Sequence, residues 1–562
     1  MDTRRTLLWV IFSVSLLFLW DAWLKHTGQP SMFSPPAAPM TAPAATASAP
    51  GASVDASVPQ PTVASSVAAP QAGAVPTTQG TQASEQWAVR TDVLSLLIDS
   101  QGAQVRRVEL LKHKDTSDKS KNVILLSEQH QYVARTGLVG VEGVPNHNTP
   151  YRRVSNLKTL PEGQNSFDLV LEAISGNIKV QKIYTFYRGR YDIGVKHVIS
   201  NQGTAALEPR LYLQLVRDGN APKGESKFYS TFTGPAVYTE VEKFRKVSFS
   251  DIEKDQAEHI KTTNNGWVAM IQHYFVTAWV PKQGTDREIQ TRKVDTNLYA
   301  INSIQKIGML APGASVTVES QLFSGPQDQK VLAALAPGLD LVVDYGWLTM
   351  LAKPLFWLLQ LFHGWTDNWG WAIILLTVLV KALFYPLSAA SYKSMAKMRA
   401  VTPRMMKIRD QYKDDRQKMN MAMMELYKTE KINPLGGCLP MLVQIPVFIA
   451  LYWTLLAAVE MRGAPWLGWI QDLTTPDPWY ILPVIMIATM WVQYKLNPTP
   501  PDPIQAKVFA VMPFIFGGMM IFFPSGLVLY WVVNNILSIA QQWQITRMIE
   551  GKPLFGRASP DA

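Results

Sequence analysis

One lysine stands inside a long apolar stretch and could attract a charged partner. Residues 367–388 are apolar enough to cross a bilayer, which takes about 20 residues, yet they contain Lys381. Thr377, Lys381, Tyr385 and Ser388 follow a spacing of i, i+4, i+8 and i+11, which places them on one face of a helix. Lys381 is expected about 10 Å inside the helix end, seven residues before Ser388. An ionisable group there predicts a functional, wet face, although a lysine extending its head group to the interface is an alternative.

A second polar stripe lies near the C-terminus of the chain. Tyr530, Asn534, Ser538 and Gln541 have the same spacing, and Gln444 adds an amide to another apolar stretch. These side chains either line a hydrophilic path with Lys381 or bind neighbouring helices through hydrogen bonds. The sequence leaves both interpretations open.

No other residues combine into a catalytic or metal-binding set. The apolar stretches hold no Ser/His pair, paired aspartates or metal ligands, and the single Cys438 excludes an intramolecular disulfide. Cys438 is interpreted as a small buried apolar residue. We therefore expect no enzyme, no catalytic residue, no metal and no cofactor. Six histidines in the central region lack ligand spacing and are interpreted as core or solvated residues: His113, His130, His147, His197, His259 and His273.

Composition indicates a membrane protein with a large soluble part. The 562 residues are 47% hydrophobic and carry a net charge of +10. Residues 1–26 begin with a basic segment followed by an apolar run, as in a cleavable signal peptide or an uncleaved signal anchor. No small-x-small cleavage site follows the run directly, so the anchor is predicted. Residues 27–84 are rich in Ala, Pro, Ser and Thr and are interpreted as a flexible tether, because they cannot bury enough apolar surface to fold. A proline-rich ligand is the alternative, but the segment lacks charged flanks.

The central part of the chain predicts β structure. Residues 178–186 alternate apolar and polar side chains, as a half-buried strand does, and similar runs recur at 191–199, 209–216, 267–280 and 315–323. Residues 85–326 are therefore predicted to form one all-β sandwich.

The remaining chain predicts helices in or on a membrane. Residues 327–366 are predicted to form an amphipathic helix lying in the interface. A complete span over 347–363 is the alternative, which Lys353 and Pro354 make less favourable. Residues 389–432 are expected to form a helical hairpin with a bend near Pro403 and the pair Asp414-Asp415, and eleven basic residues between 391 and 431 place it in the cytoplasm. The turn Phe523-Pro524-Ser525-Gly526 divides the last apolar stretch in two. Six transmembrane helices are predicted, at 1–26, 367–388, 433–460, 479–497, 507–523 and 527–546, with a cytoplasmic tail at 547–562.

Three sequence motifs resemble one family. Residues 433–440 read Asn-Pro-Leu-Gly-Gly-Cys-Leu-Pro and run on to Gln444-Ile445-Pro446-Val447-Phe448. Together with residues 523–530 (Phe-Pro-Ser-Gly-Leu-Val-Leu-Tyr) and 385–387 (Tyr-Pro-Leu), this opening is similar to the YidC-type membrane protein insertases (YidC/Oxa/Alb), Gram-negative branch, over almost the whole chain.

The resemblance implies an α-helical polytopic protein with a large periplasmic domain. Five core helices would enclose a hydrophilic groove open to cytoplasm and lipid, in which Lys381 matches a position usually held by arginine. Trp531 departs from the family pattern, which has a second tyrosine after Tyr530. Expected groove residues are Lys381, Thr377, Tyr385, Gln444, Ile445, Pro446, Tyr530, Trp531 and Asn534.

The implied function is that of an insertase and chaperone in the bacterial inner membrane, with both termini in the cytoplasm. Its expected partners are nascent inner-membrane proteins, the lipid bilayer, the Sec translocon, the ribosome and the signal-recognition-particle receptor, without sequence-specific nucleic-acid binding. A small-solute transporter is the alternative, since buried polar stripes also suit a permeation path. That class predicts internal repeats, which the sequence lacks.

Overall fold

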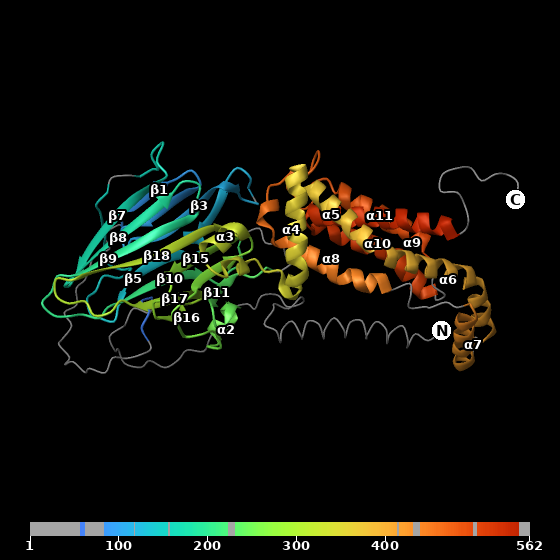
Figure 1. The fold of residues 1–562 in the computed structure, drawn as a ribbon, viewed down its shortest axis with the longest axis horizontal. Helices are drawn as coiled ribbons and strands as arrows, with labels where there is room; N and C mark the ends of the chain where they lie inside the picture. The colour runs from blue at the N-terminus through green and yellow to red at the C-terminus, as the bar shows by residue number, and fades with distance from the viewer. Residues whose placement is uncertain are drawn as a thin grey trace. The chain divides into compact units, whose positions relative to one another are not determined.

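Two compact units make up the described part of the chain. The computed structural model describes residues 57–61, 84–116, 118–155, 158–222, 231–412, 415–430, 439–497 and 503–549. One unit runs to Pro326 and includes Lys330–Val342, and the other comprises Gln327–Gln329 and the chain from Val343. Strands build the first unit and helices the second (Figure 1). The predicted anchor at 1–26, most of the tether at 27–84 and most of the tail at 547–562 lie outside the described residues.

The first unit is a β-sandwich, as predicted. Two nine-stranded sheets have the orders β1-β2-β3-β5-β10-β17-β16-β13, with β4 on β3, and β12-β11-β14-β15-β18-β9-β8-β7-β6. Neighbouring strands within each sheet pair antiparallel, for example β10 with β17 and β8 with β9. The strands are β1 (Gln86–Arg90), β2 (Leu94–Asp99), β3 (Gln104–Lys114), β4 (Asn122–Leu126), β5 (Val133–Val139), β6 (Arg152–Arg153), β7 (Ser166–Ser175), β8 (Ile178–Tyr187), β9 (Asp192–Asn201), β10 (Arg210–Asp218), β11 (Gly234–Thr239), β12 (Lys243–Lys246), β13 (Thr262–Thr263), β14 (Trp267–Gln272), β15 (Phe275–Pro281), β16 (Arg287–Asp295), β17 (Leu298–Lys306) and β18 (Ser315–Pro326).

One predicted strand was wrong. Residues 267–280 form two strands, β14 and β15, which pair with each other around His273 and Tyr274. Both strands are buried almost throughout, so their apolar pattern is continuous and no Gly or Pro marks the turn.

Buried polar groups connect the two sheets. On β8, the Lys182 ammonium donates to the carbonyl oxygens of Gly102 and Thr136, at 2.6 and 2.9 Å. The Thr136 hydroxyl lies 2.8 Å from Nε2 of His197, which is fully buried on β9. These bonds satisfy groups whose burial would otherwise be costly. His197 is thus a hydrogen-bonded core residue, in line with the interpretation from its sequence context.

We expect Lys182 to make the stability of the β domain depend on pH. Its side chain has no exposure, and burial lowers its pKa from 10.5 to about 7. Between pH 7 and 10.5 the unfolded chain therefore binds more protons than the folded one, so the free energy of unfolding rises with pH, by at most about 1.4 kcal/mol per pH unit. Denaturant unfolding of the detergent-solubilised protein at pH 7 to 9 should show a shallower slope for Lys182→Met. Equal slopes would contradict the prediction.

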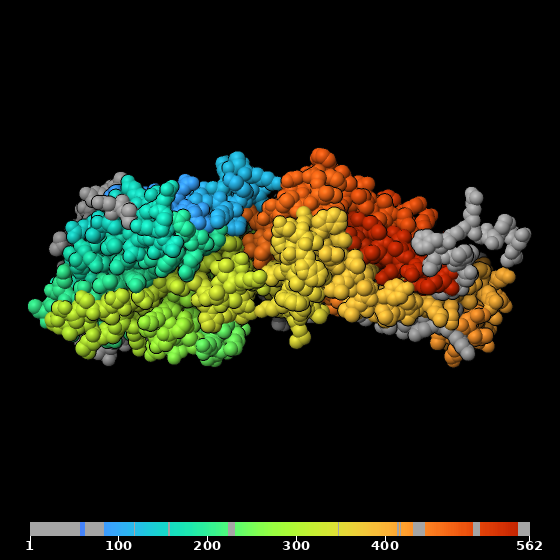
Figure 2. All heavy atoms as spheres, turned by 45° about the horizontal axis from the view of Figure 1, so that its top comes forward, coloured from blue at the N-terminus to red at the C-terminus, as the bar shows by residue number. Residues whose placement is uncertain are grey.

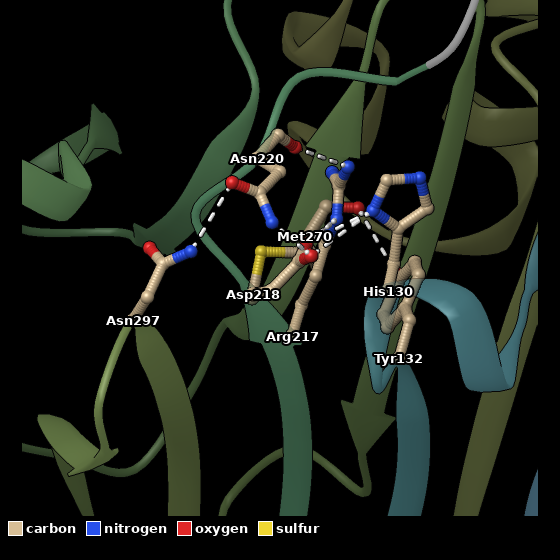
Figure 3. A network of polar contacts seen from close by, with 7 residues as sticks. All are labelled: His130, Tyr132, Arg217, Asp218, Asn220, Met270 and Asn297. Carbon is tan, nitrogen blue, oxygen red and sulfur yellow. Dashed lines mark hydrogen bonds and ion pairs between the residues drawn. The ribbon is translucent and has the colours of Figure 1, made fainter. Parts of the chain in front are cut away.

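A second buried network closes the end of β10 (Figure 3). Arg217 is fully buried, lies over the Tyr132 ring at 5.6 Å and donates to the carbonyl of Asn220 at 3.0 Å. Asp218 accepts from Asn220 Nδ2 at 2.6 Å and lies 3.0 Å from His130 Nδ1. His130 therefore stabilises a buried carboxylate.

The chain after the sandwich does not form the single amphipathic helix predicted over 327–366. It forms α3 (Gln329–Leu335), two 3₁₀ turns (Leu339–Val342 and Gly346–Leu348) and α4 (Thr349–Thr366). The apolar positions Leu332, Leu339 and Val342 are buried, and Trp267 Nε1 donates to the carbonyl of Pro337 at 3.1 Å. The first half of the segment thus packs on the β domain, which removes its apolar face from any interface.

The helical unit contains eight α-helices among its described residues. They are α4 (Thr349–Thr366), α5 (Trp369–Leu383), α6 (Tyr385–Gln411), α7 (Arg416–Thr429), α8 (Leu439–Ala457), α9 (Ile481–Leu496), α10 (Pro503–Met519) and α11 (Ser525–Ile549). The predicted break at residues 523–526 falls between α10 and α11. In the part of the chain that the structure describes, no single helix is both long and apolar enough to cross a membrane. α5 and residues Tyr385–Met398, which meet at a 65° bend, are together long and apolar enough.

The bend at Phe384 corrects the expected position of Lys381. α5 ends at Leu383, so Lys381 lies in its last turn and not 10 Å inside a helix that continues to Ser388. Pro386 sits in the first turn of α6, where a missing N–H is tolerated. Tyr385 and Ser388 therefore belong to a different helix from Thr377 and Lys381, and the predicted single stripe is wrong.

Candidate functional site

Three helices of the candidate site are fixed at one end by the segment 459–480. Asn368 caps α5 by accepting from the N–H groups of Gly370 and Trp371, at 2.9 and 3.2 Å. Its own amide donates to the carbonyls of Pro465 and Trp466, at 3.3 and 3.1 Å. α8 leads into the same segment at Ala457.

The start of α11 is attached to the same segment. The N–H groups of Ser525 and Gly526 donate to the carbonyls of Thr475 and Leu473, at 2.8 and 2.9 Å. The Ser525 hydroxyl donates to the carbonyl of Asp472 at 3.1 Å. A Cβ on Gly526 would lie 3.1 Å from the Leu473 oxygen, so this approach suits glycine. The break that the sequence shows at 523–526 thus provides N-terminal groups that the segment satisfies.

The candidate residues lie at equal distances from this end. Lys381 lies thirteen residues after Asn368, Ser538 thirteen after Ser525, and Gln444 thirteen before Ala457. At 1.5 Å per residue each lies about 20 Å along its helix. The fold therefore brings together side chains that are far apart in sequence.

A chain of hydrogen bonds joins these helices. Lys381 Nζ donates to Ser538 Oγ at 2.7 Å, and Ser538 Oγ donates to the carbonyl of Asn534 at 2.7 Å. Asn534 Oδ1 accepts from Gln444 Nε2 at 2.8 Å. We call Gln444, Asn534, Ser538 and Lys381 the polar network. The hydroxyl of Tyr392 on α6 also donates to the carbonyl of Ser538, at 3.4 Å.

The polar network holds an uncompensated positive charge. Lys381 is 8% exposed, and among the described residues no carboxylate lies within ion-pair distance of its ammonium. An ammonium has three N–H donors, and one of them is used on Ser538. Nearby, Trp531 Nε1 and Gln541 Oε1 are buried without a hydrogen-bond partner in the described part of the chain. The arrangement can therefore accept an anionic or polar group from a ligand.

The other predicted groove residues have different surroundings. Thr377 is 1% exposed and its hydroxyl donates to the carbonyl of Ile373 at 2.7 Å, so it satisfies its own helix. Tyr385 is half-buried at the start of α6. Ile445 is 44% exposed, and Pro446 is half-buried inside α8. The structure does not join these four residues to the polar network.

Tyr530 and Trp531 meet α8 through Phe448. The Phe448 ring stacks on Tyr530 at 5.9 Å between centroids and meets Trp531 edge-on at 4.7 Å. Tyr530 is 3% exposed. The two aromatic residues thus fix α11 against α8 on the side of the network that faces the segment 459–480.

The sequence interpretation missed two polar contacts between α11 and α9. Asn535 Nδ2 donates to the Thr489 hydroxyl at 3.3 Å, and Gln542 Nε2 donates to the carbonyl of Leu496 at 3.2 Å. The spacing of Asn535 and Gln542, one heptad apart, could have indicated a second polar face on this helix. These bonds attach helices to one another, which is the alternative left open for the polar stripes.

α6 and α7 form a hairpin whose methionines have two roles. Val401 and Met405 are buried and pack with Met398, Met423, Leu426 and Tyr427. Met406, Met421 and Met424 are 48%, 63% and 58% exposed. Met421 and Met424 line an open hollow of about 430 Å³ together with Asn420, Glu425 and Lys428. The predicted helical hairpin is confirmed, with its turn between Gln411 and Arg416, the stretch that contains the expected Asp414-Asp415 pair; Pro403 lies inside α6 and does not mark the bend.

The described residues offer no group of three His, Cys, Asp or Glu side chains that could hold a metal ion. The expected apolar role of Cys438, with the motif 433–438, falls outside the described residues.

Comparisons with known proteins identify what the chain is similar to. Residues 86–358 match the family model described as the YidC periplasmic domain, and residues 361–552 match the 60Kd inner membrane protein family. Curated relatives named "Membrane protein insertase YidC" include those of Bordetella pertussis, 56% identical over 98% of both chains, and Cupriavidus necator, 52% identical over 98% of both. A solved structure described as an active YidC insertase with its first transmembrane domain resolved is 18% identical, with 82% of this chain and 92% of that one covered and a TM-score of 0.39.

Proposed function

Because this chain belongs to the YidC family of membrane protein insertases, we propose that it inserts membrane proteins by drawing a polar segment of the substrate to the network around Lys381. The chain is an inner-membrane protein with a periplasmic domain, and the proposal concerns how its residues act. Lys381 attracts an acidic group in the segment that must cross, while the apolar part of the substrate passes sideways into lipid. No covalent bond is made or broken.

The observation that carries the proposal is the buried ammonium of Lys381, which donates to Ser538 but has no carboxylate partner among the described residues. A lone charge in a low-dielectric interior is costly, and an acidic substrate group would offset that cost. Such a group in hydrocarbon is itself costly by several kcal/mol. At contact distance the Lys381 ammonium and the acidic substrate group each reduce the free-energy cost of burying the other. Their attraction is therefore greatest while the acidic group lies at the depth of the network.

The depth of the polar network suits this role. If the segment 459–480 lies at the periplasmic face, the network lies about 20 Å from that face and thus roughly 10 Å from the cytoplasmic one, for a hydrocarbon core of about 30 Å. A substrate entering from the cytoplasm then meets Lys381 after a short path. We propose that Lys381, Gln444 and Asn534 line a groove open to cytoplasm and lipid, and the parts of it at Thr377, Tyr385, Ile445, Pro446, Tyr530 and Trp531 stay a prediction from the sequence.

The same proposal includes a topology of six spans with both termini in the cytoplasm. α5, α8, α9, α10 and α11 supply five spans and residues 1–26 the first. α4 lies on the surface of the helical unit (Figure 2) and exposes Met350, Trp357 and Trp365, by 88%, 62% and 69%. Exposed tryptophans beside a buried face suit a helix that lies at the periplasmic interface of the inner membrane.

The basic hairpin of α6 and α7 is proposed to receive nascent chains on the cytoplasmic side. Its exposed methionines can adapt to different apolar segments. The ribosome, the signal-recognition-particle receptor and the Sec translocon are the partners we expect for this delivery and for joint insertion.

Cross-linking tests the path of the substrate. A photoreactive residue at Ile445, which is exposed beside Gln444, should cross-link to the apolar segment of a stalled nascent inner-membrane protein. The matched control is Val484 on α9, an apolar residue that is 61% exposed and distant in sequence from the network. Equal cross-linking at both positions, or cross-linking at Val484 alone, would contradict the proposed path.

A further inference from the structure

A short part of the tether region lies on the β domain. Residues Ser57–Pro61 read Ser-Val-Pro-Gln-Pro. Pro59 is buried, and Val58 packs against Val139, Tyr212 and Ile304. The sequence interpretation treated residues 27–84 as a flexible tether and set aside a proline-rich ligand, but for residues 57–61 the structure favours that alternative.

The contacts of this segment are made through its backbone carbonyls. Gln214 Nε2 donates to the carbonyl of Ser57 at 3.2 Å, and Gln290 Nε2 donates to the carbonyl of Gln60 at 2.8 Å. The Ser57 hydroxyl lies 2.8 Å from Nε2 of His147. His147 is in turn fixed by the Tyr212 hydroxyl, which lies 2.5 Å from its Nδ1 and accepts from its N–H at 3.0 Å.

The spacing of the two glutamines matches that of the two carbonyls. Gln214 on β10 and Gln290 on β16 both pair with Asn302 on β17, so the three form one row on one face of the sheet. Two strand spacings separate the glutamines by about 9.5 Å. The carbonyls of Ser57 and Gln60 both reach this row of side chains, because they accept from Gln214 and Gln290.

The two prolines restrict the conformations that the segment can adopt when it is not bound. Pro59 and Pro61 fix their own φ, and each restricts the residue before it, Val58 or Gln60, to extended conformations. Both also lack an N–H, so the segment cannot act as an additional strand with a full set of donors. Side-chain amides that bind carbonyls are therefore the suitable mode of recognition.

The face that carries these contacts is the outer one of its sheet. Leu211, Leu213 and Leu215 alternate with Tyr212 and Gln214 along β10, and Thr136, which bonds His197 of the other sheet, pairs with Leu213. Tyr212 and Gln214 thus point away from the sandwich interior, yet both are 0% exposed. Beside the segment lies a hollow of about 620 Å³, lined by Val58, Gln60 and residues of the 138–150 turn.

We propose that this face of the β domain, comprising Gln214, Gln290, His147 and Tyr212, is a binding site for extended peptides with two prolines spaced as Pro-x-Pro. Residues 57–61 of the same chain occupy it. This inference concerns the β domain and does not depend on the mechanism proposed for Lys381.

Thiol protection tests the docking in the full chain. In a Cys438→Ser background, cysteine at Val58 should react slowly with a polar maleimide added to the periplasmic side of spheroplasts. Reaction should be roughly three- to tenfold faster with Gln290→Ala, as expected for loss of one hydrogen bond. The control Lys196→Ala removes an exposed ion pair on the other sheet and should leave the rate unchanged. Equal rates with and without Gln290→Ala would overturn the docking.

Peptide binding tests whether the face is a site for ligands in trans. The purified full chain carrying Pro59→Gly and Pro61→Gly should bind a fluorescent peptide of residues 55–63 saturably, as measured by anisotropy. Gln214→Ala and, as the less buried position, Gln290→Ala should each weaken binding roughly three- to tenfold. A peptide with the prolines separated by three residues should bind weakly. Absence of saturable binding, or equal binding of both peptides, would overturn the proposal.

Discussion

Charge reversal at Lys381 is expected to abolish insertion of substrates whose translocated segments are acidic. An ammonium at contact distance from a carboxylate in a partly desolvated groove contributes on the order of 1–4 kcal/mol, and Lys381→Glu turns this attraction into repulsion. Insertion rates for such substrates should fall by tenfold or more, since about 1.4 kcal/mol corresponds to tenfold. The measurement is protease protection of a translocated segment in proteoliposomes that contain the purified protein.

A graded series separates charge from packing. Lys381→Arg keeps the charge and can still donate to Ser538, so it should retain most activity. Lys381→Ala should give an intermediate loss, greatest for the most acidic and least hydrophobic substrates, because a strongly apolar span supplies its own driving force.

The matched control is Lys353→Glu, which makes the same charge change at an exposed lysine of α4 outside the polar network. It should insert acidic substrates normally. If Lys381→Glu equalled the unmodified protein across acidic substrates, the electrostatic mechanism would be wrong, and local thinning of the bilayer would remain as the explanation.

Removal of the hairpin formed by α6 and α7 is expected to cause the second large loss of insertion. Replacing residues 395–428 with a short linker deletes the packed methionines and the exposed ones together. Insertion should fall strongly even when the protein reaches the membrane, if the hairpin receives the substrate as proposed. Accumulation of the uninserted precursor of a pulse-labelled substrate measures the effect, and normal insertion would reduce the hairpin to a determinant of topology.

Two triple variants distinguish a role of the exposed methionines in binding substrate from a role of the packed methionines in folding the hairpin. Replacing Met406, Met421 and Met424 with serine removes exposed apolar surface and leaves the packed residues in place. This variant should insert poorly while its helix content is unchanged. Serine at Met398, Met405 and Met423 should instead loosen the packing between α6 and α7, which circular dichroism and proteolysis would detect.

The sequence predicted those elements whose pattern is periodic and whose ends carry local signals. The alternation at 178–186 matches β8, and the turn at 523–526 separates α10 from α11. Lys182 could have been recognised as inward-facing, because it shares its parity with Val180, Tyr184 and Phe186. A lysine on that face departs from the usual apolar pattern, so the alternation alone does not predict its burial.

The misses have physical causes. The bend at Phe384 had a signal in Pro386, since proline is tolerated in a first turn but disrupts a helix interior. Of the polar network, Ser538 and Asn534 could be predicted from their spacing, but their contacts with Lys381 and Gln444 depend on how three helices pack. The docking of residues 57–61 depends on a row of glutamines on strands far away in sequence, which no local pattern contains.

α5 and α11 are both attached to the segment 459–480 at their first residues, so any tilt between them grows with distance from that end. Both helices are anchored there through their first residues, by Asn368 and by Ser525. A rotation of about 5° around that end moves Ser538 by roughly 2 Å and the far end of α11 by roughly 3 Å. A hydrogen bond of 2.7 Å between Lys381 and Ser538 does not survive a displacement of that size. A tilt of α11 relative to α5 about their attached ends would therefore change the Lys381–Ser538 contact more than the contacts with the segment 459–480.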